Sequence, residues 1–169
     1  MPRAIKVTER CTGINKRNGI RCKRKTQRGP LCYAHLAINK GLKIKKSTIP
    51  KAGLGLFAIK PFKKNDIIAK YGGITVRTAD PDFGGDYVLQ LGANKYLDGD
   101  PKKTNSSIGA YSNNCQAKDK RAKLCKGNNA KFTHQTANLK ASKKIKAGDE
   151  ILSSYGRTYW TSGRQRKKL

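Results

Sequence analysis

The 169-residue chain is poor in acidic side chains and in strongly apolar ones. It holds 10 Asp and Glu against 38 Lys and Arg, which gives a formal net charge of +28. Leu, Ile, Val and Phe together number 32, about 19% of the residues. A fraction under about 20% combined with high net charge borders on the composition of disordered chains. Composition alone therefore permits an unfolded basic protein that coats nucleic acid, and an enzymatic function has to be inferred from motifs.

Long apolar runs are also missing. No stretch approaches the roughly 20 residues that a membrane-spanning helix needs. The first residues, Met-Pro-Arg-Ala-Ile-Lys, lack the apolar centre of a secretory signal. We therefore expect an intracellular protein that is not secreted and has no membrane partner. The length suits one domain with a short extension, because domains commonly run to about 100–200 residues.

Cysteine is present in an odd number, five, which in an intracellular protein favours reduced thiols or metal ligands over a disulfide framework. Cys11, Cys22, Cys32 and His35 follow the spacing Cys-x10-Cys-x9-Cys-x2-His. Residues 1–46 carry 14 Lys and Arg and one acid, and no apolar pattern long enough for a core. Zinc prefers four thiolate and imidazole ligands and orders small folds without a core. We predict a structural zinc site here; free thiols in a basic arm are the alternative.

Short apolar pieces separated by Gly, Asn, Asp and Pro occupy residues 47–159 and indicate a small, mostly β domain. The predicted pieces are Leu56–Ile59, Ile67–Tyr71, Tyr87–Leu91, Tyr96–Leu97, Ala110–Tyr111, Leu139–Ala141 and Glu150–Leu152. The basic run Arg164–Lys168 is typical of a solvated end, with a nuclear-import or phosphate-binding signal as the alternative.

The run Gly53-Leu54-Gly55-Leu56-Phe57-Ala58 has the letters of a dinucleotide-binding fingerprint. That fingerprint must open a helix, whereas Pro61 follows closely and the next apolar piece has the pattern of a strand. A Rossmann-type site is therefore excluded. Two glycines around one residue still expose backbone N–H and C=O groups to a ligand, and a glycine-relieved β-turn is the alternative.

Several short motifs follow one another in a set order. They are Lys51–Ala58, Tyr71-Gly72-Gly73, Asn113-Asn114, Asn129-Ala130 and Gly148-Asp149-Glu150-Ile151 through Tyr155-Gly156. Together, across residues 44–160, they resemble the SET domain, above all the compact protein-lysine methyltransferases of large DNA viruses that end in Tyr-Gly-x-x-Tyr-Trp. The resemblance implies a mostly β fold of short strands whose C-terminal segment is threaded through a loop, against the general rule. It divides the chain into a Cys3His zinc-binding element at 1–43, a SET domain at 44–160 and a basic tail at 161–169.

The resemblance also implies roles for individual residues. Binding of S-adenosylmethionine is implied for Lys51, Gly53, Leu54, Gly55, Asn113, Asn114, Tyr155 and Trp160. Catalysis at the lysine channel is implied for Tyr155, Tyr87 and Tyr159. Methyl transfer needs a neutral lysine, and a narrow aromatic channel beside a sulfonium disfavours the charged ammonium form. The alternative is that these aromatic residues only fill a core, which is our interpretation of Tyr111.

Two departures from the family pattern stand out. Asn114 occupies the place of a His, and a Lys-rich insertion, residues 116–128, lies between Cys115 and Asn129. We expect Cys115 and Cys125, which flank this insertion, to be free thiols in an intracellular setting. The small Ser153 stands two residues before Tyr155, which leaves the number of methyl groups transferred open.

Charge distribution bears on the partners. Five of the ten acids, Asp80, Asp82, Asp86, Asp98 and Asp100, form a local negative stretch. By resemblance this stretch borders the peptide groove, so we expect a basic, lysine-containing substrate such as a histone tail and a nuclear or chromatin location, or the virion for a viral protein. Solvated turn formers are the alternative. The Lys-rich arm and insertion predict possible nucleic-acid binding, and a homodimer is left open.

Two functions therefore follow from the sequence. The first is an S-adenosylmethionine-dependent protein-lysine methyltransferase acting on histone or another chromatin-associated protein. The second is a SET-like basic protein, impaired at Asn114, that binds nucleic acid or chromatin without catalysis.

Overall fold

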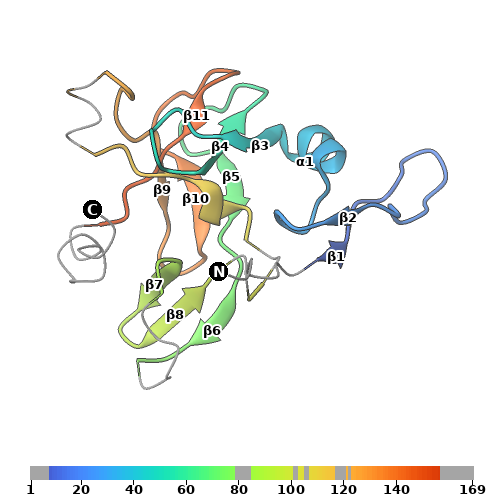
Figure 1. Ribbon diagram of the computed structural model, residues 1–169, viewed down its shortest axis with the longest axis horizontal. Coiled ribbons are helices and arrows are strands. Elements are labelled where there is room, and N and C mark those ends of the chain that lie inside the picture. Colours follow the sequence, from blue (N-terminus) through green and yellow to red (C-terminus); the bar gives the residue numbers. More distant parts are fainter. Residues whose placement is uncertain are drawn as a thin grey trace.

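A computed structural model describes residues 8–78, 85–100, 103–104, 107–116, 121 and 123–156. Tyr159, Trp160, the basic tail 161–169 and two of the acids, Asp80 and Asp82, lie outside the described residues, as do parts of the insertion. The described chain is built mainly of short strands in small antiparallel sheets (Figure 1), which confirms the mostly β prediction. None of the helices among the described residues has the length and apolar character that a bilayer crossing requires.

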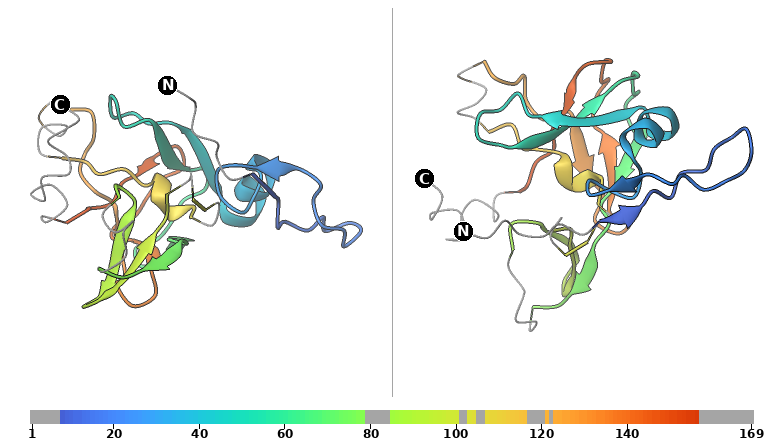
Figure 2. Two further views of the ribbon diagram at one scale, coloured as in Figure 1. Left: turned by 60° about the horizontal axis from the view of Figure 1, so that its bottom comes forward. Right: turned by 45° about the vertical axis from the view of Figure 1, so that its right-hand side comes forward.

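The N-terminal element projects from the rest of the molecule in all three views (Figures 1 and 2). It consists of the strand pair β1 (Glu9–Arg10) and β2 (Lys25–Thr26), followed by helix α1 (Tyr33–Lys40). The helix ends at Gly41, whose φ of 67° is the left-handed conformation that glycine adopts without strain. The sequence did not predict α1, because its eight residues are too short a stretch to show a clear helical period, and only Leu36 among them is buried.

The first sheet of the main domain has the order β11-β4-β3, with β3 at Leu42–Lys46, β4 at Leu54–Ala58 and β11 at Glu150–Ile151. Both pairings are antiparallel, and Leu56 of β4 lies opposite Ile44 of β3 and Ile151 of β11. Leu42, Leu56 and Ile151 are completely buried. The sheet therefore begins at Leu42. The strand that directly follows α1 is the first strand of the main domain.

Two more three-stranded antiparallel sheets complete the domain. One has the order β5-β10-β9, with β5 at Ile67–Lys70, β10 at Asn138–Ala141 and β9 at Ala130–Phe132. The other has the order β6-β8-β7, with β6 at Ile74–Val76, β8 at Lys95–Asp98 and β7 at Val88–Gly92. Six of the seven predicted pieces therefore overlap a strand of the described residues.

The seventh piece was predicted wrongly. Ala110–Tyr111 lies in a 3-10 helix, η1 (Gly109–Tyr111), and not in a strand. A Cβ at Gly109 would lie 3.2 Å from the Lys70 carbonyl oxygen, so the chain passes very close to β5 here. A tight turn accommodates this approach, whereas two apolar residues in the sequence do not distinguish a turn from a strand.

The C-terminal segment lies between two others that are distant in sequence. Leu152 forms a parallel bridge with Asn113 on one side, and Ser153 forms a parallel bridge with Ala130 on the other. The backbone N–H groups of Asn129 and Ala130 both donate to the Leu152 carbonyl. This arrangement agrees with the threaded topology that the resemblance implies.

The main core draws its side chains from α1, η1 and the sheets β11-β4-β3 and β5-β10-β9. Its buried members include Leu36 of α1, Leu42, Leu56, Leu139 and Ile151. A smaller buried cluster joins Ile49, Cys115 and Leu152, with Ala52 and Cys125 packed against it.

Cys115 and Cys125 form a disulfide, with their Cα atoms 6.1 Å apart. The prediction of free thiols at these two positions is wrong for this structure. The Asn128 side chain accepts a hydrogen bond from the Cys115 N–H at 2.8 Å, which holds the two ends of the insertion together.

The central position of β10 generates a stability prediction. Leu139 is completely buried, and β10 pairs with β5 and β9 on its two sides. Leu139→Ala removes apolar contacts and leaves a cavity, so we expect the free energy of unfolding in urea to fall by about 3 kcal/mol. Leu124→Ala is the matched control, because Leu124 is 37% exposed; its loss should stay below about 1 kcal/mol. Equal losses in the two variants would contradict this account of the core.

Candidate active site and metal centre

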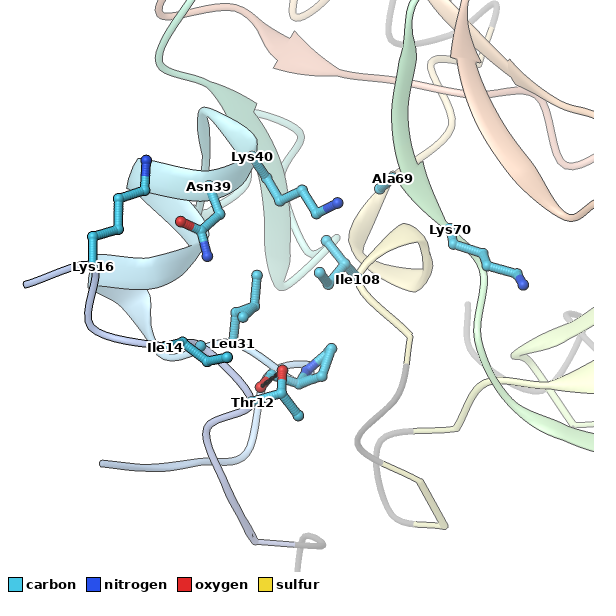
Figure 3. Close-up of a pocket in the computed structure, with 11 residues that line it drawn as sticks. Thr12, Ile14, Lys16, Leu31, Asn39, Lys40, Ala69, Lys70 and Ile108 are labelled. Carbon is cyan, nitrogen blue, oxygen red and sulfur yellow. Dashed lines mark hydrogen bonds between the residues drawn. The ribbon is translucent and has the colours of Figure 1, made fainter. Parts of the chain in front are cut away.

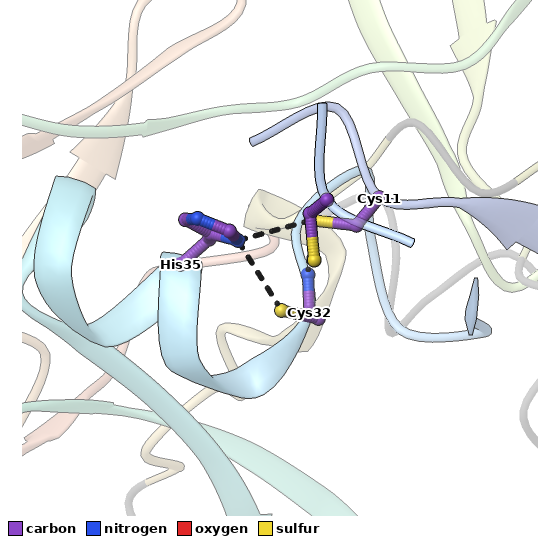
Figure 4. Close-up of side chains that lie close together, drawn as sticks. Cys11, Cys32 and His35 are labelled. Carbon is purple, nitrogen blue, oxygen red and sulfur yellow. Dashed lines mark hydrogen bonds between the residues drawn. The ribbon is translucent and has the colours of Figure 1, made fainter. Parts of the chain in front are cut away.

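Three cysteines and one histidine converge in the N-terminal element. Cys11 directly follows β1, Cys22 lies on the returning segment, Cys32 is the N-cap residue of α1 and His35 lies in its first turn. The four ligand atoms all lie within 4.8 Å of one another. The Cys11 and Cys32 sulfur atoms are each 3.5 Å from His35 Nδ1 (Figure 4). All four predicted ligands are therefore brought together.

The surroundings of the cluster affect its thiols differently and favour the thiolate at Cys32. The backbone N–H groups of Cys32 and Gly13 donate to the Cys11 sulfur at 3.1 and 3.3 Å. Burial acts to raise the pKa of Cys32, but hydrogen bonds from the His35 backbone and ring, from Cys11 and from Arg24 lower it to about 6. Burial raises the pKa of Cys11, so Cys32 is the first of this pair to ionise.

The backbone also leaves room for the imidazole ring. A Cβ at Gly13 would collide with the ring of His35, so only glycine permits this packing. Three thiols and one imidazole that converge in this way fit the tetrahedral ligand set of zinc, with every protein position filled and none open for substrate.

The second site begins at the turn between β3 and β4. Lys51 and Gly53 have φ values of 63° and 73°, and the Gly53 carbonyl accepts a hydrogen bond from the Ser47 N–H at 2.9 Å. Lys51 and Gly53 are exposed, Leu54 is half-buried and Gly55 is buried. The turn therefore presents its backbone at the surface and then enters the core through β4.

Glu150 is the residue on which this region converges. It is only 8% exposed. One carboxylate oxygen, Oε1, accepts from the Ser47 hydroxyl at 2.7 Å and from Asn113 Nδ2 at 3.2 Å. The other, Oε2, accepts from the Thr48 N–H at 2.8 Å and from the Thr48 hydroxyl. A Cβ at Gly55 would collide with the same carboxylate.

Sequence reasoning did not assign Glu150 a role. The available signal was an acidic residue at the start of the apolar piece Glu150–Leu152. A carboxylate within a buried strand must be hydrogen-bonded, so its position in the sequence already implied partners elsewhere in the chain.

Asn113 is oriented by these contacts. Its Nδ2 group donates to the Leu54 carbonyl at 3.0 Å and to Glu150, two partners that can only accept. The side-chain oxygen must therefore point the other way. This oxygen accepts no hydrogen bond from the described residues, and none of their buried side-chain polar atoms lacks a partner, so it is accessible to a ligand as an acceptor.

Asn114 has a different environment. Its side-chain oxygen accepts a hydrogen bond from Asn128 Nδ2 at 2.9 Å, and Asn128 in turn accepts from the Cys115 backbone. The Asn that stands in place of the family His is thus held by the insertion, next to the disulfide.

Tyr155 lies where the C-terminal segment meets η1. It is half-buried, and its hydroxyl donates to the Ser112 carbonyl at 3.0 Å. Ser112 also donates to the Ser153 hydroxyl at 2.9 Å, and both serines are buried. The closing tyrosine of the motif is therefore placed beside the Asn113 segment, as the resemblance implies.

Tyr87 lies just before β7 and is 39% exposed. Its carbonyl accepts from the Tyr71 hydroxyl at 2.7 Å and from the Gly99 N–H at 2.9 Å.

Burial raises the pKa of Tyr111 to about 12; Arg28 opposes this shift and the Tyr87 phenol adds to it. Tyr87 and Tyr111 are thus within electrostatic range of one another.

The negative stretch is only partly available to a partner. Asp98 is 1% exposed, and one of its oxygens lies 2.9 Å from Lys103 Nζ. The prediction that Asp98 contributes to a negative surface is therefore wrong, because its charge is buried and paired. Asp86 and Asp100 are half-buried.

A family model, the SET domain, matches residues 53–156, which is 104 of the 169 residues. Comparison with curated proteins gives no significant match. The matched range begins at the first glycine of the β3–β4 turn and ends one residue after Tyr155. Proteins of this family are generally protein-lysine methyltransferases that use S-adenosylmethionine. The match, the strand arrangement and the crossing of the C-terminal segment with the Asn113 segment agree, and the chain belongs to the SET-domain family.

Proposed function

We propose that this chain is an S-adenosylmethionine-dependent protein-lysine N-methyltransferase. One observation carries the proposal. The Gly53–Gly55 backbone, Asn113 and strand β11 meet at the buried carboxylate of Glu150. These are the segments to which the family resemblance assigns the cofactor, and they meet within the range that the family model matches.

The residues present suit that cofactor. The exposed backbone at Lys51 and Gly53 leaves space for a ligand beside β4, because glycine at 53 carries no side chain there. The accessible oxygen of Asn113 is an acceptor suited to an ammonium group. When bound, S-adenosylmethionine supplies a methyl group on a positively charged sulfur, for in-line attack by an amine.

The protein's own contribution is to align and desolvate the lysine. A lysine with a pKa near 10.4 is about one part in 10^3 to 10^4 neutral at pH 7. The half-buried ring of Tyr155 offers an apolar wall, and burial disfavours the charged amine. The Tyr155 hydroxyl is held in place by its hydrogen bond to the Ser112 carbonyl, and we assign it the role of orienting the amine. Tyr87, at the start of β7, is proposed for the channel entrance, and Tyr159 lies outside the described residues.

The substrate is proposed to be a basic, lysine-containing segment of a histone or another chromatin-associated protein, and the location the nucleus or chromatin. Asp86 and Asp100 support the choice of a basic peptide, since both retain partial exposure on the side of the β6-β8-β7 sheet.

We further propose that Cys11, Cys22, Cys32 and His35 hold one structural Zn2+. Their convergence, the N–H donors to the Cys11 sulfur and the lowered pKa of Cys32 support it. With four protein ligands the ion would order the N-terminal element and take no part in catalysis.

The proposal is tested by incubating the protein with radiolabelled S-adenosylmethionine and core histones or nucleosomes. We expect label on lysine side chains, together with saturable cofactor binding in calorimetry. Absence of both would contradict the enzyme and favour the non-catalytic SET-like protein.

Tyr155→Phe tests the assigned position of the hydroxyl. Removing it eliminates the bond to Ser112 and the group that orients the amine, so we expect the methylation rate to fall on the order of 10^2-fold. The free energy of unfolding should change by only about 1 kcal/mol, the worth of one hydrogen bond. Tyr33→Phe, assayed on free core histones without nucleic acid, is the control, because Tyr33 is 77% exposed in the N-terminal element. Full activity of Tyr155→Phe would remove Tyr155 from the mechanism.

Metal removal tests the zinc site. Purified protein should contain about one zinc per chain, measured by inductively coupled plasma mass spectrometry. Chelation, or Cys22→Ser, should increase hydrogen exchange in residues 8–41 far more than in β4, β5 and β10. Cys125→Ser should keep the metal, since Cys125 lies outside the cluster. A purified protein that contains no metal and still shows slow hydrogen exchange in residues 8–41 would disprove the assignment.

A further inference from the structure

A cavity of about 670 Å³ lies between the N-terminal element and the main domain, beside their direct contacts. Its lining comes from the segment after β1, from the end of α1, from the end of β5 and from the start of η1 (Figure 3). Among the described residues, Tyr87, Tyr155 and the Gly53–Gly55 turn do not line it. It is therefore distinct from the candidate active site.

The lining combines two kinds of side chain. Ile14, Leu31 and Ile108 supply apolar surface, and Ile14 is 57% exposed. Lys16, Lys40 and Lys70 supply three positive charges from three different segments, and all three are exposed. Figure 3 shows Lys40 reaching from the end of α1 toward β5. None of the described residues that line the cavity is an Asp or Glu, so no carboxylate among them offsets these three charges.

The charge extends beyond the cavity along the whole element. Residues 8–46 contain 12 Lys and Arg and a single acid, Glu9. A short acidic peptide would need only the three lysines of the cavity. The density of positive charge along residues 8–46 suits a longer polymer that carries a negative charge on every unit, as nucleic acid does on each nucleotide. Phosphates would meet the lysines, and sugar and base faces would meet the apolar wall.

A second feature of the same element favours nucleic acid. Tyr33, at the first position of α1, is 77% exposed, and the Arg24 guanidinium lies 5.1 Å from its ring centroid. Exposed aromatic rings next to arginine are platforms on which unpaired bases stack. α1 spans only eight residues, about 12 Å at 1.5 Å per residue, so ring and cavity lie within a few nucleotides of each other.

We propose that this cavity, lined by Lys16, Lys40 and Lys70, is the anchoring point of a nucleic-acid strand bound through its phosphates across the N-terminal element. The binding is independent of methyl transfer. It would hold the protein on a nucleic-acid-bound substrate while the tyrosine site acts elsewhere on the molecule.

The test uses fluorescence anisotropy of the full-length protein with fluorescein-labelled 12-nucleotide DNA and RNA, single-stranded and duplex, at several salt concentrations. The cavity variant is Lys16→Gln, Lys40→Gln and Lys70→Gln combined. The control variant is Lys63→Gln, Lys64→Gln and Lys143→Gln, three exposed lysines outside the cavity with the same total charge change. Circular dichroism and zinc content verify that both remain folded.

We expect the cavity variant to lose at least about 10-fold in affinity and its salt slope to fall by about 2 to 3, one unit for each lost phosphate contact. The control should lose less than about 3-fold. Equal losses in both variants would mean that only net charge attracts the polymer, and would overturn the proposal. Preferential binding of polyglutamate over all four nucleic acids would overturn it in favour of an acidic protein partner. Methylation assays on free histone run in parallel, so that failure of the enzyme proposal is recognised separately.

Discussion

The buried carboxylate of Glu150 is the constraint on which the main domain depends. A carboxylate removed from water is tolerated only when donors replace its hydration, and here the donors come from Ser47, Thr48 and Asn113. These residues are between 37 and 103 positions away in the sequence. One side chain on β11 thereby fixes the β3–β4 turn and the Asn113 segment relative to one another. Removing the carboxylate would leave these donors without an acceptor. The loss in free energy of unfolding would then exceed the net contribution of the hydrogen bonds themselves.

The same carboxylate explains the glycine at position 55. A side chain there would occupy the space of the Glu150 carboxylate oxygen, so glycine at position 55 lets this carboxylate lie against β4. The neighbouring Leu54 carbonyl accepts from Asn113 Nδ2, and that contact turns the Asn113 oxygen away from β4. The geometry offered to a cofactor is therefore a consequence of packing around Glu150. Tyr155, four peptide bonds beyond Ile151, is carried to Ser112 by the same strand.

Features set by local sequence could be predicted, and those set by distant contacts could not. The Cys/His spacing identified its cluster because metal ligands must converge, and the order of the motifs identified the SET fold. Helix α1 was missed because its single buried residue, Leu36, packs on a core built from distant strands. Likewise, η1 is a turn because Gly109 lies against β5, and the Cys115–Cys125 disulfide joins two positions that are ten residues apart in the sequence. None of these partners is a near neighbour in the sequence.

The N-terminal element and the main domain are coupled by apolar contacts, although the element has no core of its own. Leu36 is part of the main core, and a Cβ at Gly29 would lie 2.9 Å from the Ile108 side chain. The element therefore sits directly on η1, which also carries the Ser112 end of the Tyr155 contact. Ile108 additionally lines the lysine-rich cavity. Because one short turn contacts the element, the cavity and the tyrosine segment, the Cys/His cluster and the candidate active site are joined by a continuous set of contacts through η1.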